Sequence, residues 1–367
     1  MKYLLIAILT TLSVYANDVD FPEFSQLDAD GKVEYFWSQH LSHQLDPIHF
    51  QSNLAHLKEL SITNQLRVRT ILDELGYKNA PLMEVNELSE KNALKIASEW
   101  LYLGKMNVSL SAKAKKQVSK ASNYIKSLQN FRVKSEDEIY DLVHNSPDLS
   151  TYNGDYLVKL FMFCRHDRNY PCRFILKDRH DQLVRNADGT LWSLPSLAQS
   201  ARGLPYYITN GYTPSGVHTM DSVMPAANRQ DAFGKFRRVI LNWMPKGRTR
   251  ELLPNSALNK KWWKEASLAR DNDRKYLRIH GTGRTANRAR TYFPHVPTSG
   301  CISTREGKYD SVVYKDQRKI LDALMKAQDL LPSYQNETSI KGVLYVIELD
   351  DKKEKVTLKT LEQFGIK

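Results

Sequence analysis

The spacing of apolar residues along the sequence changes near residue 146, and this change constrains the fold more than any other feature. Before it, apolar residues recur at three- and four-residue steps, which is the spacing of amphipathic helices. The helices expected from this spacing cover 64–75, 93–103 and 112–128. The third carries several lysines on its polar side, which form either a solvated face or a contact for an anionic polymer. We therefore expect a mainly helical domain over residues 17–146.

After residue 146 the sequence consists of short β-branched and aromatic runs separated by turns that contain Pro and Gly, which is typical of strands. The expected strands cover 156–163, 174–176, 206–208, 239–241, 276–279 and 342–349. One amphipathic helix is expected over 314–331, where apolar residues share a stripe. The predicted fold class is α+β, in which the helical domain is followed by a mostly β domain over 150–350, with mixed sheets and one long helix. A C-terminal tail is expected over 351–367.

The first sixteen residues have the order of a signal peptide. Lys2 precedes an apolar run from Leu4 to Val14, and the segment ends at the small residue Ala16. A run of about 11 residues is too short to cross a bilayer about 30 Å thick but suits the core of a cleaved signal. We expect residues 1–16 to be removed and the mature chain to reach the periplasm or cell envelope. No integral membrane segment is expected after cleavage, since no later run is long and apolar enough.

The mature chain is expected to be basic. The sequence has 53 Lys+Arg against 41 Asp+Glu, a formal net charge of +12, which becomes +11 without Lys2. Positive charge suits an anionic partner, but export and the lack of a nucleic-acid-binding motif argue against nucleic acid. A content of 41% hydrophobic and 26% charged residues excludes a wholly disordered chain and a multi-span membrane protein.

The three cysteines divide into a possible pair and a remainder. Cys164 and Cys172 lie between two strand-like runs, so in an oxidising compartment they can form a disulfide, with two buried thiols as the alternative. Cys301 is then left outside that bond, which makes it a candidate nucleophile. No metal is expected, because the pair His40 and His43 has no acid or cysteine to complete a ligand set. No cofactor is expected.

The residues around Cys301 suit nucleophilic catalysis. Gly300 allows a tight turn that exposes the sulfur and directs the backbone amides of Gly300 and Cys301 at one point, as in an oxyanion hole. Upstream, His280 ends a strand-like run and is followed by Gly281, so its imidazole is placed to take the thiol proton. The segment between them contains further basic residues, which hold a substrate carboxylate or are solvated loop residues: Arg284, Arg288, Arg290 and His295.

These residues resemble a known family. The run IHGTGRTANRARTYFPHVPTSGC is similar to the catalytic signature of the L,D-transpeptidases with a YkuD-type domain, in which a histidine is followed after fourteen to seventeen residues by Ser/Thr-His-Gly-Cys. Here seventeen residues, 281 to 297, separate His280 from Thr298. The run Thr213-Pro214-Ser215-Gly216 resembles the family's Thr-Pro-x-Gly turn, and the helix and the strand GVLYVIEL follow in the family's order. The similarity covers residues 152 to 350.

The resemblance implies a cysteine acyltransferase that modifies peptidoglycan. Its substrate would be a tetrapeptide stem, cleaved between the diamino acid and the terminal D-alanine through a thioester on Cys301. An amine acceptor would give a 3,3 crosslink or D-amino acid exchange, whereas water would make the protein an L,D-carboxypeptidase. A third reading is a catalytically inactive protein that binds the cell wall. A papain-like peptidase is disfavoured, because its cysteine precedes its histidine.

The resemblance also implies a set of substrate-binding residues. They are Gly281, Thr298, Ser299, Ser303, Arg305, Arg284, Arg288 and, two residues beyond the Thr-Pro-x-Gly turn, His218. The chain departs from the family at two of these positions. Ser299 stands where the family has a histidine, and Ser303 stands where it has Arg or Asn, with Arg305 near enough in sequence to take over the second role. The partner is thus predicted to be a peptidoglycan stem peptide, and no oligomeric state is predicted.

Overall fold

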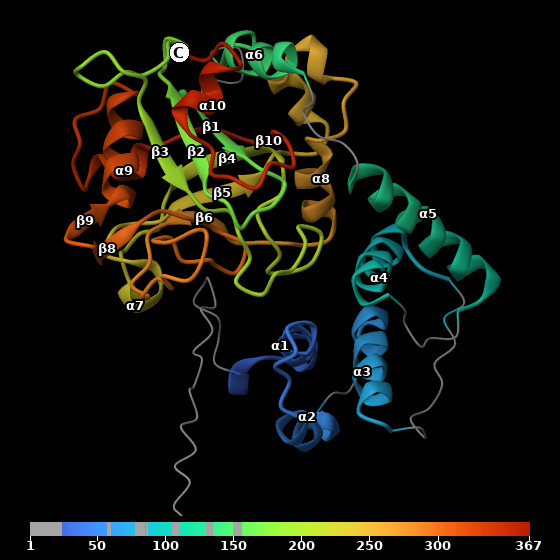
Figure 1. Cartoon of the computed structure of the whole chain (residues 1–367). Coiled ribbons are helices and arrows are strands. Elements are labelled where there is room, and N and C mark those ends of the chain that lie inside the picture. The colour runs from blue at the N-terminus through green and yellow to red at the C-terminus, as the bar shows by residue number, and fades with distance from the viewer. Residues whose placement is uncertain are drawn as a thin grey trace, which may run out of the picture.

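The computed structural model describes residues 24–56, 60–77, 85, 87–104, 110–129, 135–149 and 156–367. In this part of the chain the protein is α+β, as predicted, with a helical lobe and a lobe built on a large mixed sheet (Figure 1). The predicted signal peptide, residues 1–16, lies outside the described residues. No helix among the described residues has the length and apolarity needed to cross a membrane.

The described residues of the helical lobe form five α-helices. They are α1 (Ala29–Leu41), α2 (Pro47–Asn53), α3 (Ile62–Glu74), α4 (Glu90–Leu103) and α5 (Ala112–Gln129). The predicted helices correspond to α3, α4 and α5. Helix α4 has clear end signals: the Ser89 side chain accepts a hydrogen bond from the Asn92 amide at its start, and Gly104 takes the left-handed conformation at its end. Apolar side chains from all five helices form one buried cluster, which includes Phe36, Phe50, Leu66, Ile96 and Val118.

The second lobe is organised by an eight-stranded sheet, in the order β3-β2-β1-β10-β4-β5-β6-β7. The strands are β1 (Val158–Cys164), β2 (Cys172–Lys177), β3 (Ser193–Ser196), β4 (Gly216–Val223), β5 (Val239–Trp243), β6 (Leu277–His280), β7 (Ile302–Ser303) and β10 (Gly342–Glu348). Strand β1 pairs with β10 in parallel and with β2 antiparallel, so the sheet is mixed. A separate hairpin is formed by β8 (Glu306–Tyr309) and β9 (Val312–Lys315).

The sheet curls until its two edges meet. Leu197 follows edge strand β3, and Ser303 belongs to edge strand β7. The amide of Leu197 donates to the carbonyl oxygen of Ser303 at 2.9 Å, and the amide of Ser303 donates back at 2.8 Å. A second contact joins Ser200 to Thr298. The segment that follows β3 is therefore held against the segment that contains Cys301.

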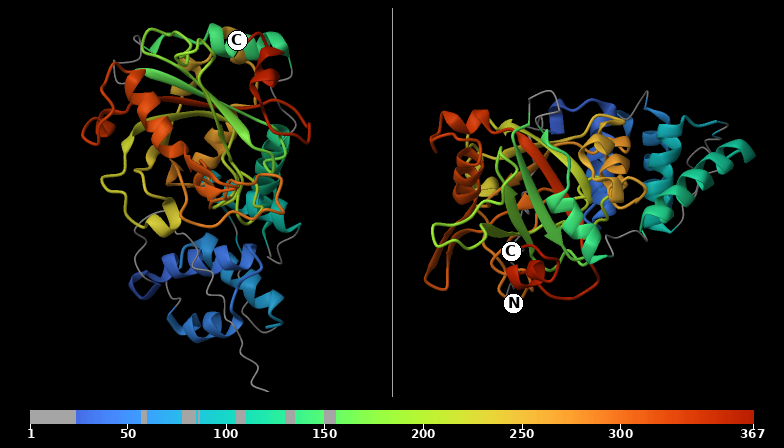
Figure 2. Two further views of the ribbon diagram at one scale, coloured as in Figure 1. Left: turned by 60° about the vertical axis from the view of Figure 1, so that its left-hand side comes forward. Right: turned by 90° about the horizontal axis from the view of Figure 1, so that it is seen from above.

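Apolar side chains cover both faces of the sheet. On one face, Leu160, Met162 and Leu344 pack against α9 (Asp316–Lys326), whose Ile320 and Leu324 are fully buried. On the other face, the sheet packs against α6 (Glu136–His144) and α10 (Leu358–Glu362) (Figure 2). The remaining helices, α7 (Gln230–Phe233) and α8 (Lys264–Asp271), lie between strands in the sequence.

Two segments pack differently from their predicted domains. Helix α6, which falls in the predicted helical domain, buries Ile139 and Leu142 in the core of the sheet lobe. The predicted C-terminal tail likewise buries Val356, Leu361 and Ile366 in that core. Both segments belong structurally to the sheet lobe, because their apolar side chains meet the strands and not α1–α5.

Two predicted elements differ from the structure. Residues 206–208 do not form a strand. They form a turn, in which the amide of Ile208 donates to the carbonyl of Pro205, while the carbonyls of Tyr206 and Tyr207 accept from side chains. The helix expected over 314–331 is shorter, since β9 extends to Lys315 and α9 ends at Lys326.

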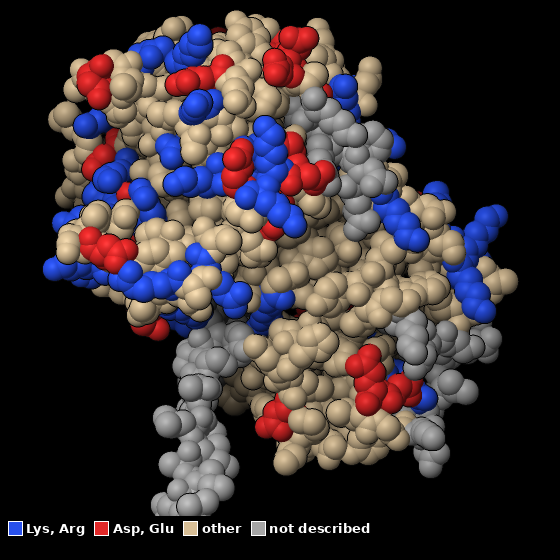
Figure 3. Space-filling view, in the orientation of Figure 1, with Lys and Arg blue, Asp and Glu red and all other residues tan. Residues whose placement is uncertain are grey.

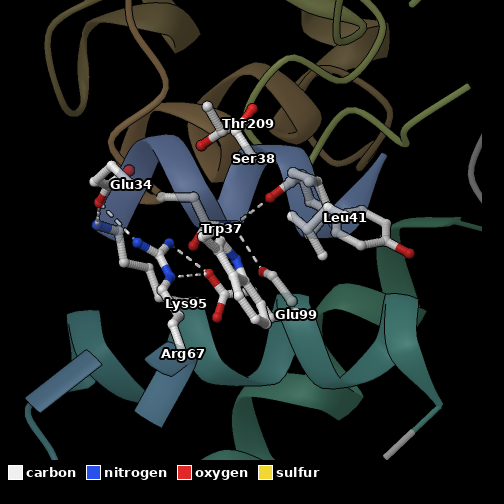
Figure 4. Close-up of a pocket in the computed structure, with 12 residues that line it drawn as sticks. Glu34, Trp37, Ser38, Leu41, Arg67, Lys95, Glu99 and Thr209 are labelled. Atoms are coloured by element: carbon white, nitrogen blue, oxygen red, sulfur yellow. Dashed lines mark hydrogen bonds and ion pairs between the residues drawn. The ribbon is translucent and has the colours of Figure 1, made fainter. Parts of the chain in front are cut away.

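The two lobes meet at a small polar cavity (Figure 4). Arg67 lies beneath it, with Nε donating to Glu99 at 2.9 Å and Nη1 donating to Glu34 at 2.8 Å. The other wall is formed by residues of the sheet lobe, among them Tyr207 and Asn272. A volume of about 20 Å³ holds little more than one water molecule. The lobes are therefore in close contact here.

Candidate active site

The sheet brings the predicted nucleophile and the predicted base to neighbouring strands. Strands β6 and β7 pair in parallel, with Ile279 opposite Ile302 and His280 opposite Ser303. Ile279 and Ile302 both face the apolar core beneath α9. Side chains alternate between the faces of a sheet, so His280 lies on the opposite face, and Cys301, directly before β7, lies on the same side as His280. Residues 21 positions apart in the sequence thus lie on the same side of two neighbouring strands.

The turn before Cys301 is held by two buried hydroxyl groups. Thr298 Oγ1 donates to the carbonyl oxygen of Cys301 at 2.6 Å. Thr213, from the predicted Thr-Pro-x-Gly turn, donates through Oγ1 to the carbonyl oxygen of Gly300 at 2.9 Å. These bonds turn both carbonyls toward the threonines and fix the backbone around the sulfur. Thr298, predicted as a substrate contact, supports the nucleophile turn in the structure.

The Cys301 thiol is nearly covered. The side chain is 1% exposed, and Sγ donates to the carbonyl oxygen of Tyr276 at 3.6 Å. His280 is 2% exposed. A substrate therefore reaches either group only when the covering segments move. The carbonyl oxygen of Gly211 lies 2.5 Å from the Cβ position of Gly300, so the segment around Gly211 packs against the turn before Cys301.

The ring of His280 is oriented by its own neighbour. Its Nδ1 forms a hydrogen bond with the carbonyl oxygen of Gly281, and the ring packs edge-on against Phe233 with centroids 5.1 Å apart. A carbonyl oxygen can only accept, so Nδ1 carries the proton in the neutral ring and Nε2 is the basic nitrogen. The carbonyl of Gly281, which is also a predicted substrate contact, therefore sets the tautomer of His280.

Glu306 lies beside this histidine and has no sequence signal that singles it out. Its Oε1 accepts from the Lys235 amide at 2.6 Å, and Oε2 lies where a Cβ on Gly234 or Gly281 would stand, at 2.0 and 1.9 Å. Burial raises the pKa of the Glu306 carboxyl, an effect opposed by the amide and the charge of Lys235. Glycine at 234 and 281 is therefore needed to admit a carboxylate next to His280.

The predicted substrate arginines occupy the outer part of the site, where Arg288 and Arg305 form ion pairs. Arg288 is exposed, pairs with Asp310 and lies over the ring of Phe293. Arg305 pairs with Asp316 at 2.5 Å. Arg284 is half-buried, as is Ser299, and Arg290 is exposed. Lys and Arg side chains form a band across this part of the molecule, around β8, β9 and the loops beside β6 (Figure 3).

Two histidines are buried near the site. His295 is close to Ser303, and burial, with a smaller effect of the Arg305 charge, lowers its pKa to about 3. His218 was expected to face the cleft, but the structure buries it completely, with its ring nitrogen Nε2 bonded to the carbonyl of Pro214 at 3.2 Å. Burial lowers the pKa of His218 to about 4. His218 therefore braces the Thr-Pro-x-Gly turn from inside and does not line a cleft.

Arg274 was not singled out by the sequence, yet it adjoins the nucleophile turn. It lies between α8 and β6 and is 4% exposed. Its guanidinium donates to the carbonyl oxygens of Tyr206, Gly211 and Tyr212, the last two at 2.7 and 3.0 Å. Its Nη2 would lie 2.6 Å from a Cβ on Gly300. As one of 53 basic residues in no motif, it carried no signal in the sequence.

The other two cysteines and possible metal ligands are separate from this site. Cys164 and Cys172 form a disulfide that links the end of β1 to the start of β2. Within the described ranges, no group of three His, Cys, Asp or Glu side chains is arranged to hold a metal ion.

Comparison of the chain with protein-family models, with curated proteins and with solved structures returns no match. The class that the fold and site define is therefore stated from their geometry alone: an α+β protein in which a buried histidine ends one strand and a buried cysteine directly precedes the parallel strand beside it.

Proposed function

We propose that this protein is a cysteine acyltransferase of the L,D-transpeptidase type that acts on peptidoglycan stem peptides. The observation that carries the proposal is the placement of Cys301 and His280 on one side of neighbouring strands, with His280 Nδ1 bonded to a carbonyl. That arrangement supplies a nucleophile, a basic nitrogen and a group that orients the base, which together suit acyl transfer.

The proposed reaction consists of two acyl transfers at one sulfur. Cys301 Sγ attacks the carbonyl carbon of the diamino acid, and the thiol proton passes to His280 Nε2. Backbone amides at Gly300 and Cys301 receive the negative oxygen of the tetrahedral intermediate. The C–N bond to D-alanine then breaks, and His280 returns its proton to the leaving amine. An acceptor amine attacks the thioester, forms the new amide and releases the Cys301 thiol.

The basic band beside the site supports an anionic substrate. Stem peptides carry several carboxylates, and Arg284, Arg288 and Arg290 lie on the loop between the base and the nucleophile. Clefts and surfaces of one charge raise the local concentration of an oppositely charged substrate. Because Arg288 and Arg305 already have acidic partners, the exposed Arg290 is the better candidate for a stem carboxylate.

The proposal predicts that Cys301→Ala abolishes the processing of tetrapeptide-bearing peptidoglycan. His280→Gln should lower the rate by roughly a hundredfold to ten-thousandfold, the usual contribution of a general acid–base group. The measurement is incubation of the full chain with isolated sacculi and analysis of the muropeptides by mass spectrometry. Arg179→Gln, an exposed change far from Cys301 in the sequence, is the control and should keep wild-type activity.

The products distinguish the alternatives. New 3,3 dimers or exchanged D-amino acids support a transpeptidase, and loss of D-alanine alone identifies an L,D-carboxypeptidase. If wild-type protein leaves sacculi unchanged but still sediments with them, the protein is an inactive wall-binding relative of such enzymes and the proposed reaction is wrong.

A further inference from the structure

The strongest unassigned feature is the buried cation beside Cys301. Burying a guanidinium costs several kcal/mol unless it is paired. Among the described residues, no carboxylate forms an ion pair with Arg274; its partners are the three carbonyls of residues 206, 211 and 212. These dipoles hold the guanidinium in place but supply no full negative charge. The position is therefore suited to a nearby anion.

The titratable groups around Arg274 leave one candidate for that anion. Tyr212 is buried and its pKa is raised well above the ordinary value, so its phenol is neutral. His218, on β4, has a pKa lowered to about 4 and is also neutral near pH 7. Glu265, on α8, has a pKa raised to about 8 by burial and by the charge of Glu348, so it is mostly protonated. Burial lowers the pKa of Arg274 to about 10, and the negative charge of a Cys301 thiolate opposes that change.

We propose that Arg274 is a positioning residue that holds Cys301 as a thiolate. The proposal rests on the proposed function, because it assigns the state of that nucleophile before substrate binds. A positive charge next to a cysteine favours its deprotonated form. The thiol proton is then released before substrate binds, so it does not pass to His280 during the attack. His280 instead takes up a proton from solvent, donates it to the leaving amine and later accepts one from the attacking amine.

The helical lobe fixes the segment that holds Arg274. Ser38, on α1, accepts hydrogen bonds from Asn210 Nδ2 at 3.1 Å, through Oγ, and from Arg202 Nη1 at 3.1 Å, through its carbonyl. Asn272 Nδ2 donates to Ser98 Oγ on α4 at 2.7 Å and to the carbonyl of Tyr207 at 2.9 Å. Ser38 and Thr209 face each other across the lobe junction (Figure 4). These bonds hold the helical lobe against residues 202–212, the segment whose carbonyl oxygens accept hydrogen bonds from the Arg274 guanidinium.

The test is a pH titration of the thiolate by its ultraviolet absorbance, with Cys301→Ala as the blank and the disulfide intact. This readout does not require a reagent to reach a covered thiol. Wild type should titrate at least one pH unit below the ordinary cysteine value of about 8.5. His280→Gln should keep most of that shift, whereas Arg274→Gln should move the midpoint to 8.5 or above.

Arg165→Gln is the control. Arg165 is another buried arginine, but two carboxylates balance its charge: Nη1 donates to Asp350 at 2.7 Å and Nη2 donates to Glu354 at 2.8 Å. We expect its removal to move the midpoint by less than half a unit. A wild-type midpoint at or above 8.5 overturns the proposal. This outcome is read from the wild-type protein, so it does not depend on whether the Arg274 variant folds. A midpoint that rises fully in His280→Gln also overturns it, because the histidine would then hold the thiolate.

The titration needs no peptidoglycan, so the two proposals fail separately. If the midpoint is low and depends on Arg274 but the protein does not change sacculi, Arg274 stabilises the thiolate and the proposed substrate is wrong. If the protein processes sacculi but Cys301 titrates at the ordinary value, the proposed function is supported and the proposed role of Arg274 is wrong.

Discussion

Gly300 stands directly before Cys301 with a φ of +103°, a conformation that residues with a side chain rarely adopt. A Cβ at this position would lie 2.5 Å from the carbonyl oxygen of Gly211 and 2.6 Å from Arg274 Nη2. Neither atom can move away alone, because Arg274 Nη2 donates to the Gly211 oxygen at 2.7 Å. The absence of a side chain therefore allows the guanidinium to approach the nucleophile turn.

We expect Gly300→Ala to lower the free energy of unfolding by about 2 to 4 kcal/mol, since strain and overpacking add. Gly203→Ala is the matched control, because Gly203 also has a positive φ (+66°) but has no atom within 4 Å of its Cβ position. Its cost should be about 1 kcal/mol, from backbone strain alone. Urea unfolding measures both. Equal losses in the two variants would mean that Arg274 and Gly211 yield easily and do not hold the turn.

Single residues differ in how much the sequence reveals about them. Cys301 and His280 could be predicted, because each sits in a local pattern of glycine and strand residues that has a chemical meaning. Arg274 and Glu306 could not, because their importance comes from neighbours more than twenty residues away in the chain. His218 was misplaced for a related reason. Its position two residues after a turn is a local feature, but its burial depends on which face of β4 meets the core.

At the scale of elements, the start of α8 supports the turn that carries Thr213. Glu265, in the first turn of α8, accepts from the Ser215 amide through Oε2 at 2.9 Å. Gly216 follows with a φ of +138°, and a Cβ there would lie 2.5 Å from the carbonyl oxygen of Trp263. The Ala266 amide of α8 also donates to the carbonyl oxygen of Ser215 at 2.9 Å, so hydrogen bonds in both directions and one close backbone contact hold the Thr-Pro-x-Gly turn on α8.

This contact predicts a pH dependence of stability. Burial, and then the charge of Glu348, raises the pKa of Glu265 from 4.5 to about 8. Between these values the folded protein binds one proton more than the unfolded chain, so this contribution is fully present below pH 4.5 and is lost as the pH rises to 8. We expect wild type to lose stability relative to Glu265→Gln over this range, measured by urea unfolding at pH 5, 6.5 and 8.

Glu251→Gln is the control for that prediction, because Glu251 is an exposed glutamate paired with Arg248. The free energy of unfolding of Glu251→Gln should change with pH as that of wild type does over the same range. The effect of pH on stability through His218 has the opposite sign. Because the pKa of His218 is lowered from 6.5 to about 4, the contribution of this histidine to stability is lost as the pH falls from 6.5 to 4. A wild-type curve parallel to that of Glu265→Gln would show that Glu265 is ionised in the folded protein.

Elements with strong periodicity were predictable, and elements made by long-range contacts were not. Helices α3, α4 and α5 follow their apolar spacing. Residues 206–208 resemble a strand in composition, but Arg274 and Asn272 take two of their carbonyl oxygens and leave a turn. Side-chain donors from distant residues thus decide a local conformation that β-propensity alone would assign to a sheet.

At the scale of the whole molecule, the side chain of Asn272 forms one of the hydrogen bonds that join the two lobes. It is buried and joins Ser98 on α4 to the carbonyl of Tyr207. We expect Asn272→Ala to lower the free energy of unfolding by about 1 to 3 kcal/mol, because two buried acceptors lose their donor. Urea unfolding followed by far-ultraviolet circular dichroism and by tryptophan fluorescence should then give transitions that no longer coincide.

Asn186→Ala is the control for this change. Asn186 is exposed and donates to Thr190 Oγ1 at 3.0 Å, so its loss should cost less than about 0.5 kcal/mol. Coincident transitions in Asn272→Ala at unchanged stability would mean that the lobes are joined mainly by apolar contacts. In that case the apolar cluster shared by α1–α5, Tyr206 and Leu268 would hold them together.

The domain boundary was predicted from the change in sequence texture, which reports local periodicity and not packing partners. Helix α6 has helical spacing and was assigned to the helical domain, but its apolar side meets the sheet. Residues 351–367 were predicted to form a tail, yet three widely spaced apolar residues of this segment pack against the sheet lobe: Val356, Leu361 and Ile366.

The short separation between Cys164 and Cys172 also affects how the chain oxidises as it folds. These cysteines are 8 positions apart, whereas Cys301 lies about 130 positions beyond them. Loop closure costs roughly 0.6 kcal/mol for each doubling of length, so four doublings favour the short pair by about 2 to 3 kcal/mol, or about 50-fold. The unfolded chain therefore pairs its first two cysteines preferentially, and the thiol of Cys301 is spared from a mismatched bond before its site exists.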